Sequence, residues 1–74
     1  MTTKWHKLVA KNVRNLRMKA GFNQEEFADK CMINRSFLGM IERGERNVSL
    51  STLVVIAEAL KITPGELMAS QPRN

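Results

Sequence analysis

The sequence predicts one all-α domain of five short helices. Apolar residues recur at three- and four-residue steps along most of the chain, which is the period of a helix that buries one face. A residue that favours helix N-caps precedes each of the last four apolar segments. Strand signals are nearly absent, because the only β-branched run, Val54 to Ile56, lies within a helical period. We place the domain at residues 3–69 and expect a short flexible tail at residues 70–74.

The first two helices are expected at residues 4–20 and 24–31. Gly21 follows the first helix, where a glycine commonly ends a helix. The apolar stripe of this helix is formed by Trp5, Val9, Val13, Leu16 and Ala20. Asn23 and Glu26 have the spacing of a capping box and therefore mark the start of the second helix. Its buried face is formed by Phe27, Ala28 and Cys31.

The third helix is expected from Arg35 to Arg43, after the cap residue Asn34 and before Gly44. It turns Leu38 and Ile41 inward. Only Met32 and Ile33 separate the second helix from this cap. Two short helices joined by a turn of this length are typical of a helix-turn-helix.

The fourth and fifth helices complete the domain. Ser49 caps the fourth, whose apolar stripe is formed by Leu50, Leu53, Ile56, Ala57 and Leu60. Thr63, Pro64 and Glu66 supply a cap, a residue with a preset φ angle and a capping-box acid for a short helix that ends near Ala69.

The charge balance favours a polyanionic partner, either nucleic acid or anionic lipid. Twelve Lys and Arg residues against seven Asp and Glu residues give a net charge of +5. The first nineteen residues contain no acid, and their basic residues are Lys4, Lys7, Lys11, Arg14, Arg17 and Lys19. A solvated helix face is the alternative interpretation of this run.

The composition excludes several other kinds of protein. With one cysteine, Cys31, and one histidine, His6, the chain forms no internal disulfide and no zinc cluster, so we expect neither metal nor cofactor. The methionines are expected to fill the core or an interface. Catalytic Ser-His-Asp sets and phosphate-binding loops are missing, which argues against an enzyme. No apolar run is long enough for a membrane span, and a soluble cytoplasmic protein is expected. Because so short a chain buries little surface, oligomerisation is the remaining route to stability.

Four sequence elements occur in a characteristic order. They are VRNLR at residues 13–17, GFNQEEFA at 21–28, IERG at 41–44 and the apolar segment at 53–60. Across residues 9–68 the chain resembles the helix-turn-helix family of phage lambda-type repressor and Cro proteins. The resemblance implies a lambda-repressor-like DNA-binding domain that binds palindromic operators of double-stranded DNA as a homodimer. Contact with RNA polymerase at a promoter stays open.

Within that family, residues 34–37 and 43–47 look like those of the controller proteins of restriction-modification systems. Antitoxins and Cro-like phage regulators that act through a protein partner share most of the pattern and remain the alternative. Two residues depart from the family, because Met32 and Lys61 stand where it often has glycine. If either backbone is left-handed, a residue with a side chain is strained there.

The resemblance makes the third helix the recognition helix, whose outward residues face the major groove. The expected base-reading residues are Arg35, Ser36, Phe37, Gly39 and Met40. Arg35 can donate two hydrogen bonds to guanine, and Ser36 can bond to several bases or a phosphate. Phe37 contacts a thymine methyl group or, alternatively, packs on the edge of the domain. Gly39 allows the helix to approach DNA closely or simply occupies an unconstrained position.

A second group is expected to contact the DNA backbone or the minor groove. It comprises Arg17, Gln24, Asn34, Arg43, Arg46 and Asn47. Gln24 opens the second helix, whose free amides and positive dipole attract a phosphate. Pairing of Arg17 with Glu42 is the alternative to a phosphate contact. The expected dimer interface comprises Ile62, Leu67 and Met68, which would otherwise only pack on the core.

Three competing functions are less well supported by the sequence. A binder of RNA or of single strands would need more stacking aromatics than three Phe and one Trp. An antitoxin that wraps its toxin would need a longer tail than residues 69–74. A membrane-surface helix at residues 2–19 would use the apolar stripe that the core requires.

Overall fold

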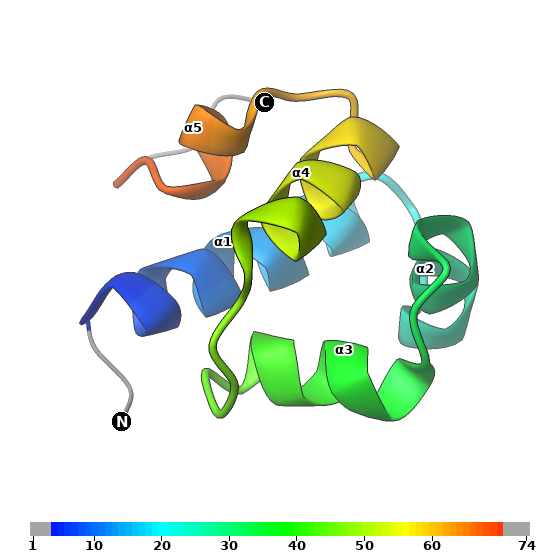
Figure 1. Cartoon of the computed structure of the whole chain (residues 1–74). Coiled ribbons are helices and arrows are strands. Elements are labelled where there is room, and N and C mark those ends of the chain that lie inside the picture. The colour runs from blue at the N-terminus through cyan, green and yellow to red at the C-terminus, as the bar shows by residue number, and fades with distance from the viewer. Residues whose placement is uncertain (1–3, 71–74) are drawn as a thin grey trace.

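The computed structural model describes residues 4–70, which form five helices as predicted (Figure 1). The helices are α1 (Lys4–Lys19), α2 (Gln24–Cys31), α3 (Arg35–Glu42), α4 (Leu50–Ala59) and α5 (Pro64–Leu67). The described part of the chain contains no strand. Except for Ser70, the predicted flexible tail lies outside the described residues, as does the predicted domain limit at residue 3.

The helices enclose a single core. In Figure 1, α4 crosses α1, while α2 and α3 lie together on one side and α5 lies on the other. α3 contacts both α1 and α2, and α5 packs on α1 and α4. The largest fully buried side chains are Phe27, Leu38, Ile41, Ile56, Leu67, Val13 and Asn12. Within residues 4–70, no helix is both long and apolar enough to cross a membrane.

Side-chain caps fix where the helices begin. The Asn23 side-chain oxygen accepts from the backbone N–H of Glu26, and the Glu26 carboxylate accepts from the backbone N–H of Asn23, which confirms the capping box. Thr63 and Glu66 form a second capping box at α5, whereas Asn34 and Ser49 cap α3 and α4 by accepting from the backbone N–H three residues on. α2 has the predicted bounds, whereas α1 and α3 end one residue earlier than predicted and α5 two residues earlier.

Three residues predicted to face the core are exposed instead. Trp5 is 52% exposed and Leu50 is 75% exposed, and Ala20 also lies on the surface. Each follows the apolar period of its segment, but Trp5 and Leu50 occupy the first turn of α1 and α4, and Ala20 lies just beyond α1. Helical spacing alone does not reveal that the core ends before the helix does.

Two residues other than glycine have left-handed backbones. Met32 has a φ angle of 59° and Lys61 one of 60°, at the two positions where the sequence departs from the family. The left-handed turn geometry is therefore retained without glycine, and the strain costs about 1–2 kcal/mol of stability per residue. Met32 ends α2, and its N–H donates to the carbonyl of Asp29. Gly21 and Gly44, which follow α1 and α3, also have positive φ angles.

Candidate nucleic-acid interface

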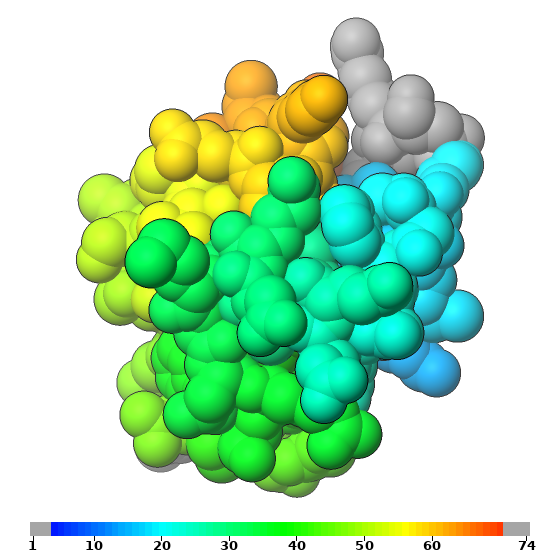
Figure 2. Space-filling model, turned by 90° about the vertical axis from the view of Figure 1, so that its right-hand side faces the viewer, coloured from blue at the N-terminus to red at the C-terminus, as the bar shows by residue number. Residues whose placement is uncertain are grey.

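α2 and α3 present one continuous surface, with the turn that joins them (Figure 2). The cap at Asn34 determines which residues of α3 point outward, because its side-chain oxygen accepts from the N–H of Phe37 at 2.7 Å. Leu38 and Ile41 are buried on the opposite face, as predicted. Ile33 packs against the core, and its N–H donates to the Ala28 carbonyl. The turn therefore holds α3 at a defined angle to α2.

An open hollow on this surface brings together most of the predicted base-reading residues. Its lining comprises Gln24, Arg35, Ser36, Gly39, Met40 and Arg43. A second hollow adjoins it at Gln24 and Arg35 and includes Asn23 and Glu25. The start of α2 and the outward face of α3 thus form one polar groove, which we call the α2–α3 groove and define by the six residues that line the first hollow. Hydrogen-bond donors and positive charge along such a groove suit a polyanion.

Phe37 does not line the α2–α3 groove. Its side chain is half-buried against the core, and the Arg46 guanidinium lies 5.5 Å from the centre of its ring. This contact is within the range of a cation–π interaction. The placement favours the packing alternative for Phe37 over contact with a thymine methyl group. Asn47 is exposed in the loop that follows α3. DNA contacts by Asn34, Arg46 and Asn47 remain predictions.

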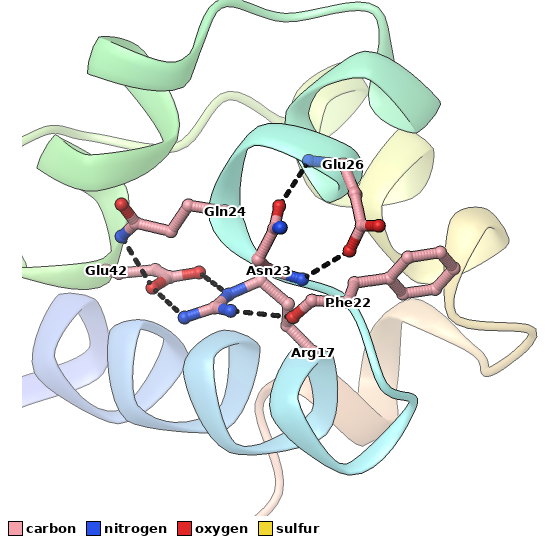
Figure 3. A network of polar contacts seen from close by, with 6 residues as sticks. All are labelled: Arg17, Phe22, Asn23, Gln24, Glu26 and Glu42. Carbon is pink, nitrogen blue, oxygen red and sulfur yellow. Dashed lines mark hydrogen bonds and ion pairs between the residues drawn. The ribbon is translucent and has the colours of Figure 1, made fainter.

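The predicted phosphate contact of Arg17 is wrong, because its side chain is buried in an ion pair with Glu42 (Figure 3). The two side chains are 9% and 3% exposed. Arg17 Nε donates to Glu42 Oε2 at 2.7 Å, and Nη2 donates to Oε1 at 3.0 Å. Nη1 donates to the Phe22 carbonyl at 2.8 Å. All three guanidinium nitrogens are therefore used inside the protein, and none is presented to DNA.

Glu42 also holds Gln24, so the ion pair reaches the groove. Gln24 Nε2 donates to Glu42 Oε1 at 3.1 Å. One N–H of the amide is used in this way, which leaves its other N–H and its carbonyl oxygen for a ligand. The network joins α1, α2 and α3 through Arg17, Gln24 and Glu42 (Figure 3). It therefore places the Gln24 side chain at the start of α2, where anions are favoured.

A second ion pair lies at the exposed end of α3. Arg43 Nε donates to Glu45 Oε2 at 3.0 Å, and the side chains are 59% and 54% exposed. The hydrogen bond from Arg43 lowers the pKa of the Glu45 carboxyl below its ordinary value. The same bond raises the pKa of Arg43, and the negative charge of Glu45 raises it further. Both groups are therefore ionised at neutral pH.

Cys31 is a buried part of the core, as predicted. Burial raises the pKa of its thiol, an effect that the nearby Lys30 charge partly opposes. A thiol that is kept protonated in this way is a poor nucleophile. In residues 4–70, no three His, Cys, Asp or Glu side chains gather as metal ligands would.

The predicted dimer interface needs a correction at Leu67. This side chain is fully buried in the core of its own chain and so cannot be shared with a second copy. Ile62 is partly buried against the same core, and Met68 is exposed. Asn12, which was not predicted as a structural residue, explains the position of α5. Its side-chain amide donates to the carbonyls of Leu67 and Ala69 at 2.7 and 2.8 Å.

A signal for Asn12 was present in the sequence. The residue lies three positions after Val9 and next to Val13, within the apolar stripe of α1. A polar residue in such a stripe is buried with its hydrogen-bond partners or not at all. In the described part of the chain, every buried side-chain nitrogen and oxygen has a partner.

Comparisons with known proteins identify the family of this chain. A helix-turn-helix family model matches residues 13–67. The chain is 39% identical over 64 residues to the control protein C.SmaI of Serratia marcescens. The aligned region covers 86% of this chain and 76% of that protein. It is 38% identical over 69 residues to the control protein C.BamHI of Bacillus amyloliquefaciens, covering 92% of this chain and 85% of that protein.

A solved structure shows the same similarity in three dimensions. The restriction-modification controller protein C.AhdI of Aeromonas hydrophila superposes with a TM-score of 0.83 and 38% sequence identity, covering 88% of this chain and 98% of that protein. The residues matched by the helix-turn-helix family model include all of α2 and α3, together with the turn between them. This chain therefore belongs to the helix-turn-helix family of DNA-binding transcription regulators, which bind DNA and are not enzymes.

Proposed function

We propose that the protein is the controller of a restriction-modification system and binds a palindromic operator as a homodimer. The observation that carries the DNA-binding mode is the α2–α3 groove, in which Gln24 lies beside Arg35, Ser36 and Met40. Two relatives and one solved structure described as control or controller proteins support the narrower role, since each matches most of the chain. Such a protein acts on bacterial DNA, and its place of action is the cytoplasm.

Arg35 reads a base in this proposal, with Ser36 and Met40 beside it. Arg35 is exposed in the first turn of α3, and its guanidinium can donate two parallel hydrogen bonds to guanine O6 and N7. Gln24 binds a phosphate through its remaining N–H and the free amides that open α2. The Gln24 contact fixes the protein on the backbone, and the Arg35 contact supplies sequence preference.

Selection of binding sites from random double-stranded DNA tests this assignment. The wild-type protein is expected to select an inverted repeat. Arg35→Ala is expected to lose about 1–3 kcal/mol and its preference at one base pair of each half-site. Gln24→Ala is expected to weaken binding to all sequences about equally. Arg14→Ala serves as a control, because it removes the same charge from an exposed site on α1 outside the groove. A wild-type consensus without an inverted repeat would contradict the proposal.

The homodimer is proposed to use Ile62 and Met68, without Leu67. A single helix-turn-helix makes too few contacts for specific affinity, and two copies would match the symmetry of an operator. Sedimentation at about tens of micromolar tests the assembly. Met68→Glu is expected to shift the protein toward monomer, whereas Met18→Glu, at an exposed methionine of α1, should not. Monomers of the wild type with and without operator DNA would exclude the dimer.

The regulatory outcome depends on where the operator lies. A dimer bound across a promoter blocks transcription, whereas one bound beside the promoter can contact RNA polymerase and activate it. Footprinting on the DNA upstream of its own gene, followed by transcription in vitro with purified polymerase, distinguishes these outcomes. Protection overlapping the start site together with reduced transcript indicates repression.

A further inference from the structure

The guanidinium of Arg43 lies against the position that a Cβ atom of Gly39 would occupy. A Cβ atom built on Gly39 would be 3.2 Å from Arg43 Nη1 and 4.0 Å from Cζ. Arg43 follows Gly39 by four residues, and its N–H donates to the Gly39 carbonyl, so both face the same side of α3. The side chain of Arg43 therefore reaches back along the helix and covers the glycine.

Glu45 holds this guanidinium by one edge only. The hydrogen bond to Glu45 uses Nε of Arg43. The opposite edge, with parallel N–H groups on Nη1 and Nη2, makes no hydrogen bond to any residue between 4 and 70. Such a pair of parallel donors matches the two acceptors O6 and N7 of guanine. A carboxylate on one edge of the group reduces its freedom and so leaves the other edge better oriented.

The covered glycine lies in the α2–α3 groove together with Arg35. Gly39 follows Arg35 by four residues, which corresponds to about 6 Å along the helix axis. Base pairs are about 3.4 Å apart along DNA, so this distance spans roughly two base pairs. The Arg43 guanidinium thus lies within about two base pairs of the one that Arg35 reaches.

We propose that Arg43 is a second base-reading residue of α3, placed in the groove by the missing side chain of Gly39 and oriented by Glu45. The inference rests on the proposed function and replaces the predicted backbone contact of Arg43. It also gives Gly39 a definite role, since a side chain there would press against the guanidinium and displace it.

Site selection from random double-stranded DNA with the full chain separates base reading from phosphate binding. Arg43→Ala is expected to lose preference at one base pair of each half-site, within about two base pairs of the position affected by Arg35→Ala. Affinity for the preferred sequence should fall about tenfold, and affinity for the sequence altered at that pair should change little. Arg14→Ala again removes the same charge outside the groove. Equal weakening on all sequences with an unchanged consensus would overturn the proposal.

Gly39→Ala tests the space above the glycine without removing a charge. The neighbouring atom is the end of a flexible side chain, so the guanidinium can move away and the helix should fold as well as before. The expected result is a weaker preference at the base pair affected by Arg43→Ala, since the guanidinium is displaced but not removed, with an unchanged or higher melting temperature. Gly65→Ala is the matched control, since a Cβ there meets Thr63 Oγ1 at an ordinary 3.9 Å. Full preference in Gly39→Ala would overturn the assignment.

Two substitutions of Glu45 separate orientation from charge. The amide oxygen of Glu45→Gln can still accept from Arg43 Nε, so this variant should keep the base preference and bind every sequence more tightly. Glu45→Ala removes the acceptor and should reduce, without abolishing, the preference at the Arg43 base pair, because an exposed pair only biases the orientation of the guanidinium. Identical behaviour of the two variants would show that only the charge matters and would overturn the orienting role.

The failure of this inference is distinguishable from failure of the proposed function. If the wild type selects a consensus that Arg35→Ala relaxes and Arg43→Ala does not, only the role of Arg43 is wrong. If the wild type selects no consensus at all, both proposals are wrong. Loss of preference at two different base pairs in the two variants supports both.

Discussion

Glu42 and Arg43 are neighbours in sequence, yet each belongs to an ion pair of a different kind. Glu42 binds Arg17 in the interior, where the two side chains are 9% and 3% exposed. Arg43 binds Glu45 on the surface, where more than half of each side chain is exposed. Arg17 uses two guanidinium nitrogens on Glu42 and the third on the Phe22 carbonyl, whereas Arg43 uses only Nε, on Glu45.

The difference shows that burial decides the role of an arginine–glutamate pair. The buried pair stabilises the framework of packed helices, and the exposed pair is available to a ligand. A buried charge that loses its partner stays in a medium of low polarity, so Arg17 and Glu42 cannot exchange partners while the protein is folded. An exposed charge is solvated at once, so Arg43 can release Glu45 or gain a partner at little cost. One pair therefore holds α1, α2 and α3 together, and the other leaves a guanidinium ready for a ligand.

Breaking the buried pair should have the largest effect on stability. Glu42→Ala leaves the Arg17 charge buried with only the Phe22 carbonyl as a partner and is expected to cost about 3–5 kcal/mol. Denaturant unfolding followed by circular dichroism measures this loss. Replacement of both residues, Arg17→Met with Glu42→Leu, removes the unpaired charge and should recover much of it. A loss of stability below about 1 kcal/mol for Glu42→Ala would show that the buried pair contributes no more than an exposed ion pair.

Asn12 makes a neutral buried contact, whose expected contribution to stability lies between those of the two ion pairs. Asn12→Ala leaves the carbonyls of Leu67 and Ala69 without their donor and is expected to cost about 1–3 kcal/mol. Asn15→Ala, at an exposed site on the same helix, should change stability by no more than about 0.5 kcal/mol. Urea unfolding of both variants provides the measurement. Equal effects would mean that the α5 contact contributes nothing to the framework.

Backbone strain at Met32 affects stability at an exposed site that carries no charge, so it separates the effect of exposure from that of ion pairing. Met32 is 92% exposed and has a left-handed backbone, so Met32→Gly relieves strain and loses little packing. The expected gain is about 0.5–1 kcal/mol, because glycine also adds freedom to the unfolded chain. Met18→Gly, at an exposed position in the last turn of α1, should instead lose up to about 1 kcal/mol. Thermal melting distinguishes the two, and a loss in Met32→Gly would contradict the strain.

The smallest effect on stability is expected for the exposed pair. Glu45→Ala should leave the melting temperature unchanged at neutral pH, at low and at high salt. Because Arg43 lowers the pKa of Glu45, the contribution of this pair is present above the ordinary pKa of a glutamate and disappears as the pH falls through the lowered one. A melting temperature that drops by several degrees at neutral pH would show that the pair belongs to the framework.

Local chemistry explains which parts of the structure the sequence predicted. The caps at Asn23, Asn34, Ser49 and Thr63 are local contacts between residues three apart, so cap residue types ahead of apolar segments, with a capping-box acid in two cases, located four helix starts. The outward face of α3 followed directly from the cap at Asn34. The family resemblance then assigned that face to DNA, an assignment that helical spacing could not make.

Long-range contacts explain what sequence reasoning did not settle. Arg17 and Glu42 are 25 residues apart, and Asn12 contacts residues 55 and 57 positions away. No helical period contains this information, because it depends on how the helices pack. The same limit applies to Leu67, whose burial depends on α1 and α4, and to Gly39, whose neighbour is a folded-back side chain.

The length of α3 limits how much sequence one copy can read. Its eight residues extend about 12 Å, which corresponds to three or four base pairs. Four defined base pairs recur by chance about once in 250 positions, and a genome offers on the order of a million positions or more, so one copy meets thousands of equivalent sites. Two copies that read eight base pairs still meet roughly ten. Such short readout makes the number of protein molecules in the cell, as well as the quality of each contact, decide which sites are occupied.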